Sequence, residues 1–580
     1  MEYRYVQSAE QLMTCMDSLL SAKVMAVHIQ TAGPEPHRHR LRLIQLAVPE
    51  CPVVAVDAFS VLPEGKPLLK RILEGPAVKV FHNAKTALSF LLAEDIQVEN
   101  LFDTMLAAQL LRSSGGPCKA DLDTVCRHYL PDPVPQAAEM GGAQTAEGSR
   151  EELESAVETA RALLKLRDAM IPELYANGLN LIAKIEIDCA KAITQMEYHG
   201  IWLDLARWEE ERCKMEKVQR AALKELYTFA EQPAYQLTFW GDEVALNAGS
   251  FDSNPYVIRL LKQNGIDVTS TDKQHLLPYA DHPLVRALSA YRKSSKALSS
   301  FLYPIPVMID SVTGRLHPKY DQIGASSGRM SCGGPNIQQI PREQAFRRCF
   351  CAPKGKKLVI ADYSQIELRV AACISGDKRM MEAYQKGEDL HTLTAALICG
   401  TSVGSVTKAQ RQAAKAVNFG LIFGMGAAGL AAYARQSYGV DMTQEQAAAF
   451  RERFFKAYPG ISAWHQRIAA AAPTEERTLT GRKFTFRKNA GLSGLYNTPV
   501  QGTAADIAKA ALGDLVRRLK HTGTKIIAIV HDEILLEADA QDAEAAAAVL
   551  KSAMELAGER ILRGVPCVAD VKIVDDWAEK

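Results

Sequence analysis

Lys357-Lys-Leu-Val-Ile-Ala-Asp-Tyr-Ser-Gln-Ile-Glu-Leu-Arg369 is the segment from which the rest of the chain can be interpreted. Its apolar, β-branched run at 358–361 is typical of a buried strand, and residues 365–369 have the pattern of a starting helix. Asp362 is therefore expected where the strand ends, a position from which a carboxylate could hold a metal ion in a cleft. An Asp before an apolar periodic run also commonly caps a helix, and this segment alone favours neither role.

A second pair of acids lies near the end of the chain. His531-Asp-Glu533 separates two apolar runs, 525–530 and 534–537, which predicts a tight hairpin turn. Both runs are too apolar for a surface hairpin, so Asp532 and Glu533 should lie at the edge of a buried sheet. Asp362 and Asp532 on one sheet face would repel each other unless cations were bound. Two Mg²⁺ ions about 3.5–4 Å apart could then clamp the attacking and leaving oxygens of a phosphoryl displacement.

A predicted helix lies between these acids. It spans the Ala-rich residues 411–424, and four side chains recur at steps of four along one face: Arg411, Lys415, Phe419 and Phe423. Two cations followed by two rings suit a nucleoside triphosphate, because charges can meet the phosphates and rings the sugar and base. The alternative is a solvated basic end that runs into an aromatic core contact. Gly420 and Gly424 lower helix propensity and predict an end or bend where something approaches closely.

These three segments resemble motifs A, B and C of the family A DNA polymerases, the bacterial DNA polymerase I type. Residues 362–369 match motif A, 411–424 match motif B and 530–533 match motif C, in the order of the family. The resemblance covers essentially the whole chain, in the form of a large fragment without the 5′-nuclease domain. It implies a multidomain α/β and α+β fold, in which an RNase H-like exonuclease-type domain precedes a right-hand polymerase domain.

The resemblance also implies domain boundaries. The exonuclease-like domain is expected at 1–175 and the polymerase domain at 176–580. Within the polymerase domain, the thumb is expected at about 205–305, the palm at about 306–372 and 491–580, and the fingers at about 373–490.

Composition sets broad limits. A chain of 580 residues should hold several domains, and its net charge of +1 does not by itself indicate nucleic-acid binding. A DNA-binding face would need Lys and Arg segregated to one side. The 12 cysteines show no paired metal-ligand spacing, no signal peptide is evident and no apolar run is long enough to cross a membrane. These features predict a reduced, cytosolic protein.

Strand and helix signals alternate over the first 130 residues. Strands are predicted at 23–29, 41–48, 53–57 and 78–82, with helices at 62–73 and 84–92, which is the pattern of an α/β domain. This region resembles the 3′–5′ exonuclease domain of the same polymerases, and its best marker is Leu101-Phe-Asp-Thr-Met-Leu106. A Pro-, Gly- and Ala-rich tether is predicted at 130–148, followed by a helix at 150–174.

The active form of that exonuclease domain uses four acids to hold two metal ions, and this chain lacks them. The resemblance aligns those positions and a neighbouring Tyr with residues that carry no carboxylate: His28, Gln30, Ala87, Ser155 and Thr159. Asp103 is retained but belongs to the framework. We therefore expect a structural domain with no proofreading activity.

The resemblance assigns catalytic roles. Asp362 and Asp532 are expected to hold two Mg²⁺ ions, for which Mn²⁺ could substitute, together with the main-chain carbonyl of Tyr363. Lys415 is expected to protonate the leaving pyrophosphate, and Glu533 to support the site without being a primary ligand.

It also assigns residues to the incoming nucleotide. Arg411, Lys415 and His391 would offset phosphate charge, while Gln365 and Phe419 would contact the nucleotide. Glu367 would lie under the sugar and exclude a 2′-hydroxyl. Because residue 419 is Phe and not Tyr, the resemblance implies poor acceptance of dideoxynucleotides.

Contacts to primer–template DNA are expected from residues in the thumb, palm and fingers: Arg292, Lys296, Arg329, Asn336, Gln338, Phe423, Asn497, Gln501 and His531. Minor-groove acceptors occur on every base pair, so polar residues at 329–338 would test base-pair shape without reading sequence. Asn336 could instead serve only its turn, and the thumb cations could be merely solvated. The chain departs from the family at Ser493, commonly Arg, and at Phe423, which replaces a Tyr.

The expected function is template-directed DNA synthesis in replication or repair. The partners are primer–template DNA and deoxynucleoside triphosphates, without a membrane, and the protein is expected to be a monomer. A single-subunit RNA polymerase shares the palm chemistry, but Glu367 argues against it. Reverse transcription is compatible with every motif. A silent DNA-binding scaffold is the non-enzymatic alternative, and the intact Asp362 and Asp532 argue against it.

Overall fold

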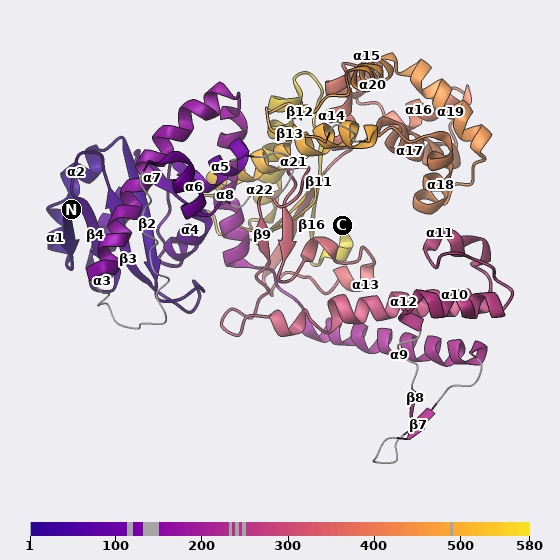
Figure 1. The fold of residues 1–580 in the computed structure, drawn as a ribbon, viewed down its shortest axis with the longest axis horizontal. Coiled ribbons are helices and arrows are strands. Elements are labelled where there is room, and N and C mark those ends of the chain that lie inside the picture. Colours follow the sequence, from indigo (N-terminus) through magenta and orange to yellow (C-terminus); the bar gives the residue numbers. More distant parts are fainter. Residues whose placement is uncertain are drawn as a thin grey trace. The chain divides into compact units, whose positions relative to one another are not determined.

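The computed structural model describes residues 2–112, 120–131, 150–230, 235–237, 243–245, 251–487 and 491–580. Residues 132–148 of the predicted tether lie outside the described residues. The chain divides into two compact units, coloured along the sequence in Figure 1. The first comprises Met1–Gly200, His317–Gln338 and Lys354–Val574, and the second comprises Ile201–Leu316, Gln339–Pro353 and Asp575–Lys580.

The first unit begins with a six-stranded sheet of order β1-β4-β3-β2-β5-β6. Its strands are β1 (Tyr3–Val6), β2 (Val24–Thr31), β3 (Leu41–Ala47), β4 (Val53–Asp57), β5 (Val78–Phe81) and β6 (Leu101–Asp103). β3 is antiparallel to both β2 and β4, and the remaining pairs are parallel. The predicted α/β organisation of this region is confirmed, and the four predicted strands are present.

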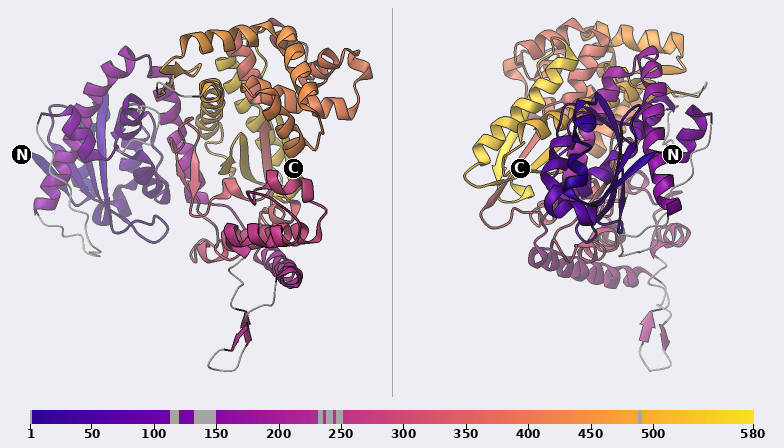
Figure 2. Two further views of the ribbon diagram at one scale, coloured as in Figure 1. Left: turned by 45° about the vertical axis from the view of Figure 1, so that its right-hand side comes forward. Right: turned by 90° about the vertical axis from the view of Figure 1, so that its left-hand side faces the viewer.

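Helices cover both faces of this sheet, as Figure 2 shows. One face packs on α1 (Ala9–Met13), α2 (Met16–Ser21), α3 (Ala58–Leu73) and α4 (Ala84–Ala93). The other packs on α5 (Thr104–Arg112), α6 (Leu122–Tyr129) and α7 (Arg150–Ala176). Apolar residues point to both faces in alternation along the strands, so both need a covering layer.

The second of these faces shares its core with the segment that follows. Ile182, Ile185 and Ala190 of α8 (Asn180–His199) belong to the same buried cluster as Val80 of the sheet and Leu163 of α7. The N-terminal domain and α8 therefore have one continuous hydrophobic core.

A second, four-stranded antiparallel sheet has the order β14-β15-β11-β16. Its strands are β11 (Lys356–Tyr363), β14 (Lys525–Val530), β15 (Glu533–Asp539) and β16 (Ala569–Val574). β11 continues through Asp362, and the next helix, α14 (Ile366–Ser375), has Gln365 as its N-cap. The alternative in which Asp362 caps that helix is therefore wrong.

Helices pack on this sheet and extend from it. α8, α21 (Leu492–Arg518) and α22 (Ala543–Leu562) contact one another or the strands, and Figure 1 shows α21 and α22 beside the sheet. The segment between α14 and α21 is helical: α15 (Lys378–Gln385), α16 (Leu390–Cys399), α17 (Lys408–Ile422), α18 (Ala427–Tyr438), α19 (Gln444–Ala457) and α20 (Pro459–Ala471). Two short hairpins complete the first unit: β9 (Lys319–Asp321) with β10 (Ser331–Gly333), and β12 (Glu475–Arg477) with β13 (Lys483–Thr485).

The second unit is mainly helical. Two long helices, α9 (Leu205–Phe229) and α12 (Pro283–Ala297), pack against each other, and apolar residues from both fill a core with Phe251 and Leu260. The other elements are α10 (Asn254–Gln263), α11 (Lys273–Leu276), α13 (Gln344–Arg347), β7 (Tyr235–Leu237) and β8 (Glu243–Ala245). In the part of the chain that the structure describes, no helix combines the length and apolarity needed to cross a membrane.

Candidate active site

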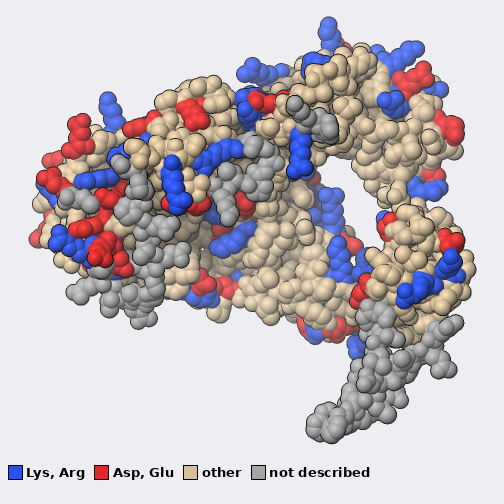
Figure 3. Space-filling model, in the orientation of Figure 1, with Lys and Arg blue, Asp and Glu red and all other residues tan. Residues whose placement is uncertain are grey.

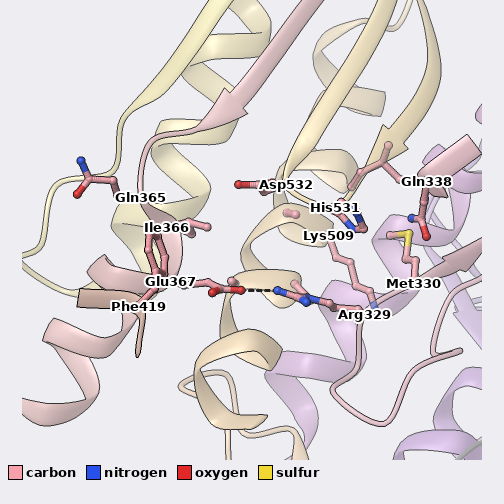
Figure 4. A pocket seen from close by; sticks show the side chains of 14 residues that line it. Arg329, Met330, Gln338, Gln365, Ile366, Glu367, Phe419, Lys509, His531 and Asp532 are labelled. Carbon is pink, nitrogen blue, oxygen red and sulfur yellow. Dashed lines mark hydrogen bonds and ion pairs between the residues drawn. The ribbon is translucent and has the colours of Figure 1, made fainter. Parts of the chain in front are cut away.

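A cavity of about 280 Å³ lies in the first unit, where β14 turns into β15. Figure 4 shows the side chains around it. Its lining includes many of the residues singled out from the sequence: Arg329, Gln338, Gln365, Glu367, Phe419, His531 and Asp532. These residues come from distant segments, from Arg329 to Asp532, so the fold assembles them into one pocket.

The two predicted metal-binding aspartates lie at the same end of the four-stranded sheet. Asp362 lies directly opposite Glu533 in the register of β11 and β15. Asp532 immediately precedes Glu533, in the turn where His531 adopts a φ of 61°. Asp532 is among the residues that line the cavity (Figure 4). The tight hairpin turn predicted for His531-Asp532 is therefore present, whereas Glu533 belongs to the strand.

The donor set at this edge fits hard divalent cations. Among the described residues, no three His, Cys, Asp or Glu side chains come together to hold a metal ion. The site instead offers two aspartates and the carbonyl of Tyr363, whose phenol donates away from it to the Met554 carbonyl at 2.9 Å. Mg²⁺ commonly takes one or two protein carboxylates and completes its shell with substrate phosphates and water. The residues present match that pattern.

An ion pair crosses the cavity between Arg329 and Glu367 (Figure 4). Glu367 lies in the first turn of α14, and burial raises the pKa of its carboxyl group. The Arg329 guanidinium lowers that pKa and the nearby charge of Asp532 raises it, so the net direction is upward. Glu367 is thus held at the wall of the pocket by a cation from another segment.

The predicted phosphate-binding residues cluster at the start of α17. A capping box of Thr407 and Gln410 begins this helix. Arg411 donates from Nε to Oδ2 of Asp389 at 2.6 Å, and the same carboxylate caps α16. This arrangement places the guanidinium beside the α16 N-terminus, where His391 lies.

His391 joins this cluster as a neutral side chain. It is 3% exposed, and burial, together with the charges of Arg411 and Lys415, lowers its pKa to about 4 despite Asp389. Its Nδ1 is 2.9 Å from the Asn418 amide nitrogen, and its ring centroid is 6.0 Å from that of Phe419. α16 and α17 therefore bring the predicted cations, the imidazole and the Phe419 ring together.

Gly420 within α17 and Gly424 just after its end both allow close packing. The helix continues through Gly420 and ends at Ile422, two residues before the predicted end at residue 424. A Cβ on Gly420 would lie 2.8 Å from Cδ1 of Leu430, and one on Gly424 would lie 2.7 Å from Cδ2 of Tyr496. The predicted close approach is therefore present, and the approaching groups are side chains of α18 and α21.

Family models match most of the chain. Residues 251–579 match DNA polymerase family A, and residues 3–175 match a 3′-5′ exonuclease domain. DNA polymerase I of Aquifex aeolicus is 32% identical, in an alignment that covers 100% of both chains. The chain belongs to DNA polymerase family A. Its members are generally dependent on divalent metal ions, in agreement with the oxygen donors described above.

Other relatives support this membership. The polymerase is 32% identical to the thermostable DNA polymerase I of Thermus filiformis, over 86% of this chain and 57% of that one. It spans about half the length of the Thermus relatives that it matches. The POL domain of Pol1 from M. smegmatis, solved in complex with DNA primer-template and dNTP, has a TM-score of 0.80 and 23% identity over 99% of each chain. The predicted family, fold class and enzyme class are confirmed.

The residues predicted to contact DNA have diverse surroundings in the polymerase. Asn336 accepts a hydrogen bond from the Gln338 backbone at 3.1 Å, so it does support its own turn. Asn497 donates to the Ser493 hydroxyl at 3.0 Å, one turn earlier on α21, which also carries Gln501. Phe423 follows α17 as its C-cap and is half-buried. Their contacts to DNA stay predictions.

The thumb cations differ from each other. Arg292 donates to the Thr271 carbonyl at 2.9 Å and to Oδ1 of Asn254 at 3.1 Å, so it holds α12 to the segment at Thr271 and to the start of α10. Lys296 is exposed in the last turn of α12. On the face shown in Figure 3, Lys and Arg are interspersed with acids over the N-terminal domain. That part of the surface is not segregated by charge.

Two residues that hold the site were missed from the sequence. Asp389 orients Arg411, and Lys509 lines the cavity from α21. Asp389 precedes an apolar run, which is the usual signal for a helix cap and could have identified it. No local pattern marks Lys509, because a lysine in an Ala-rich helix normally indicates a solvated face.

Three of the positions at which the active domain carries an acid lie on the face of the N-terminal sheet that α7 covers, whereas Ala87 lies on α4, which packs on the other face. His28 and Gln30 alternate on β2, and Ser155 and Thr159 lie on α7. Burial lowers the pKa of His28 to about 4, so its imidazole is neutral at pH 7. Asp103, by contrast, accepts four backbone N–H groups around the β5–α4 and β6–α5 junctions, as a framework residue would.

Proposed function

We propose that this polymerase adds deoxynucleotides to a primer 3′-hydroxyl at the cavity between Asp532, Glu367 and Phe419. The observation that supports the proposal is the strand register that brings Asp362 opposite Glu533, the residue next to Asp532. Asp532 lines the cavity, and Asp362 is not among its lining residues. Two carboxylates brought close together at one end of a sheet repel each other, and bound divalent cations would remove that repulsion.

Asp362 and Asp532 would hold two divalent ions, with the carbonyl of Tyr363 as a further donor; Mg²⁺ is the ion that we propose, and Mn²⁺ could replace it. When bound, such ions lower the pKa of the primer hydroxyl and neutralise charge on the triphosphate and leaving group. Glu533 is buried within β15 and supports the turn that carries Asp532.

The fingers residues would bind the triphosphate. Arg411, oriented by Asp389, and the neutral imidazole of His391 donate hydrogen bonds to phosphate oxygens. Lys415, one turn further along α17, would donate a proton to the leaving pyrophosphate. Phe419, which lines the cavity, packs on the nucleotide, and Gln365 contacts it from the N-cap of α14.

Glu367 would lie under the sugar and exclude a 2′-hydroxyl, so the substrates would be deoxynucleoside triphosphates. Primer–template DNA would contact Arg329, Gln338 and His531, which line the same cavity. The M. smegmatis structure, which contains DNA primer-template and dNTP, supports both partners by analogy of fold. The Phe423 ring would remain beside the template base without a hydroxyl to bond it.

Primer extension tests this proposal. Wild-type protein and Asp532→Ala would be compared with Mg²⁺ and the four deoxynucleotides on DNA and RNA templates, with thermal unfolding as a check of folding. We expect the folded variant to lose extension on DNA. Unchanged extension would remove the mechanism, and extension on RNA would add reverse transcription to the activity.

We propose further that the N-terminal domain does not proofread, because neutral side chains occupy the four positions at which the active domain carries metal-binding acids: His28, Gln30, Ala87 and Thr159. Ser155 likewise stands where that domain has a Tyr. A primer labelled at its 5′ end and mismatched at its 3′ end would be incubated with Mg²⁺ or Mn²⁺ without nucleotides. We expect no shortening. Metal-dependent shortening that is lost in His28→Ala would contradict the proposal.

A further inference from the structure

A buried lysine next to the cavity uses its whole hydrogen-bonding capacity on protein groups. Lys509 is 1% exposed, and its ammonium donates to Oε1 of Glu186 at 2.6 Å, to the Gln322 carbonyl at 2.7 Å and to the Gly328 carbonyl at 2.8 Å. Three donors are all that an ammonium has. Its position is therefore determined from three directions.

Two further charges complete a buried cluster around it. Arg482, beside β13, donates to Oδ1 of Asp506 at 2.7 Å and also pairs with Glu186. Burial alone would raise the pKa of Glu186, but Lys509 and Arg482 together lower it, so its carboxylate stays ionised. Two cations and two anions with satisfied hydrogen bonds can persist in a protein interior, whereas loss of one member leaves an uncompensated charge.

This cluster lies against the loop at 322–330 that joins β9 to β10. Lys509 binds that loop at both ends, through the carbonyls of Gln322 and Gly328. Gly328 has a φ of +78°, and a Cβ there would lie 2.8 Å from Cδ of Arg482. The loop backbone is therefore fixed directly on the charged cluster.

The next residue along this loop is Arg329, which pairs with Glu367 across the cavity. Figure 4 shows Lys509 and Arg329 on the same side of the pocket, with Glu367 facing them. Lys509 is thus connected to Glu367 through three links: its hydrogen bond to the Gly328 carbonyl, the peptide bond from Gly328 to Arg329, and the ion pair of Arg329 with Glu367.

We propose that Lys509 is a positioning residue for sugar selection: it fixes the loop, the loop fixes Arg329, and Arg329 fixes the carboxylate of Glu367. This inference rests on the proposed function, in which Glu367 excludes the 2′-hydroxyl. Loosening this path lets Glu367 move, so ribonucleotides are rejected less well while the chemistry at Asp362 and Asp532 continues.

The test compares kcat/KM for a deoxynucleotide and the matching ribonucleotide. Lys509→Met keeps the length of the side chain and removes its donors. We expect the deoxy-to-ribo ratio to fall by about tenfold, with kcat for the deoxynucleotide changed less than its KM. In an Arg329→Ala background, Lys509→Met should change the ratio by no more than about twofold, because the path is already interrupted.

Arg482→Met is the matched control, because Arg482 belongs to the same cluster but donates no hydrogen bond to the loop. Arg482 touches the loop only where its side-chain stem packs on Gly328, and methionine retains an atom at the δ position of that stem. If destabilisation alone lowers selectivity, this variant lowers the ratio as much as Lys509→Met does, and the proposal is overturned. The proposal is also overturned if folded Lys509→Met keeps the wild-type deoxy-to-ribo ratio. Independent effects would overturn it too: in that case the double variant would lower the ratio by the product of the two single-variant factors.

Two single variants keep the test decisive should Lys509→Met not fold. Arg329→Ala must lower the ratio if the path exists, so a wild-type ratio in that variant overturns the inference. Glu367→Ala separates the two levels of the argument. A wild-type ratio in Glu367→Ala refutes the proposed role of Glu367 itself, whereas a lowered ratio there with an unchanged ratio in Arg329→Ala refutes only the path.

Discussion

Asp362 and Glu533 are direct partners in the register of β11 and β15. Glu533 is 5% exposed and fixed within its strand, while Asp532 belongs to the turn before it and lines the cavity. The two adjacent acids therefore differ in their surroundings: Glu533 is buried in its strand, whereas Asp532 lines the cavity.

Amide substitution should distinguish these two acids. We expect Asp532→Asn to lower kcat by more than about 10³-fold, since a lost metal ligand removes several kcal/mol of transition-state stabilisation. Glu533→Gln keeps the shape of a supporting residue and should cost no more than about tenfold. Single-nucleotide primer extension measures both, and equal losses would show that Glu533 is itself a ligand.

The buried imidazole of His391 should make stability depend on pH. Its pKa is about 4 in the folded protein against 6.5 for an unperturbed histidine, so the unfolded state binds more protons between these values. Stability should fall as pH drops from 6.5 to 4, by at most about 3 kcal/mol from this residue. His391→Gln should show a smaller loss in urea unfolding between pH 7 and 5; an identical loss would contradict this.

The end of α17 should tolerate a methyl group at one glycine and not at another. Gly424 has a φ of +81°, and a Cβ would meet the Tyr496 ring, so Gly424→Ala should cost about 1–3 kcal/mol. Gly426 has a φ of −75°, with nothing within 4 Å of a Cβ, so Gly426→Ala is the control and should be nearly neutral. Thermal unfolding compares the two variants. Equal effects would mean that the Tyr496 contact is unimportant.

The buried charge cluster should be sensitive to loss of one member. Arg482→Met leaves Glu186 and Asp506 short of a partner in the interior and should cost about 3–5 kcal/mol. Arg517 on α21 pairs with Asp514, but its side chain is 63% exposed, so Arg517→Met should cost less than about 1 kcal/mol. Denaturant unfolding measures the difference, and a cost below that of Arg517→Met would be the contrary result.

Local patterns in the sequence were sufficient for many elements. The apolar run before Asp362 predicted β11, and the cations and rings at steps of four predicted α17. Both predictions rest on hydrophobic period and composition, which can be recognised over a few residues. The exact ends were less accessible. The sequence predicted a helix start at residue 365 but left open whether Asp362 caps it. The N-cap is Gln365, in a left-handed conformation that no rule assigns to glutamine.

Contacts between distant segments could not be predicted. Lys509 and Glu186 are separated by 323 positions, and an isolated lysine or glutamate indicates a solvated side chain in any single-sequence analysis. Arg292 gives the converse case. Its charge on a predicted thumb helix suggested a phosphate contact, yet Thr271 and Asn254 engage its guanidinium. Tertiary packing decides which charged side chains are buried or bonded to other protein groups, and the periodicity of the sequence does not predict it.

The hydrophobic core common to the N-terminal sheet and α8 has an evolutionary consequence. Metal-binding acids of a nuclease domain can be replaced one at a time, because each replacement leaves the hydrophobic core intact. Deletion of the whole N-terminal domain would have a larger effect, because it would expose the apolar residues of α8 to water and favour aggregation. If the exonuclease activity is absent, as we propose, selection for solubility alone would be enough to preserve the domain.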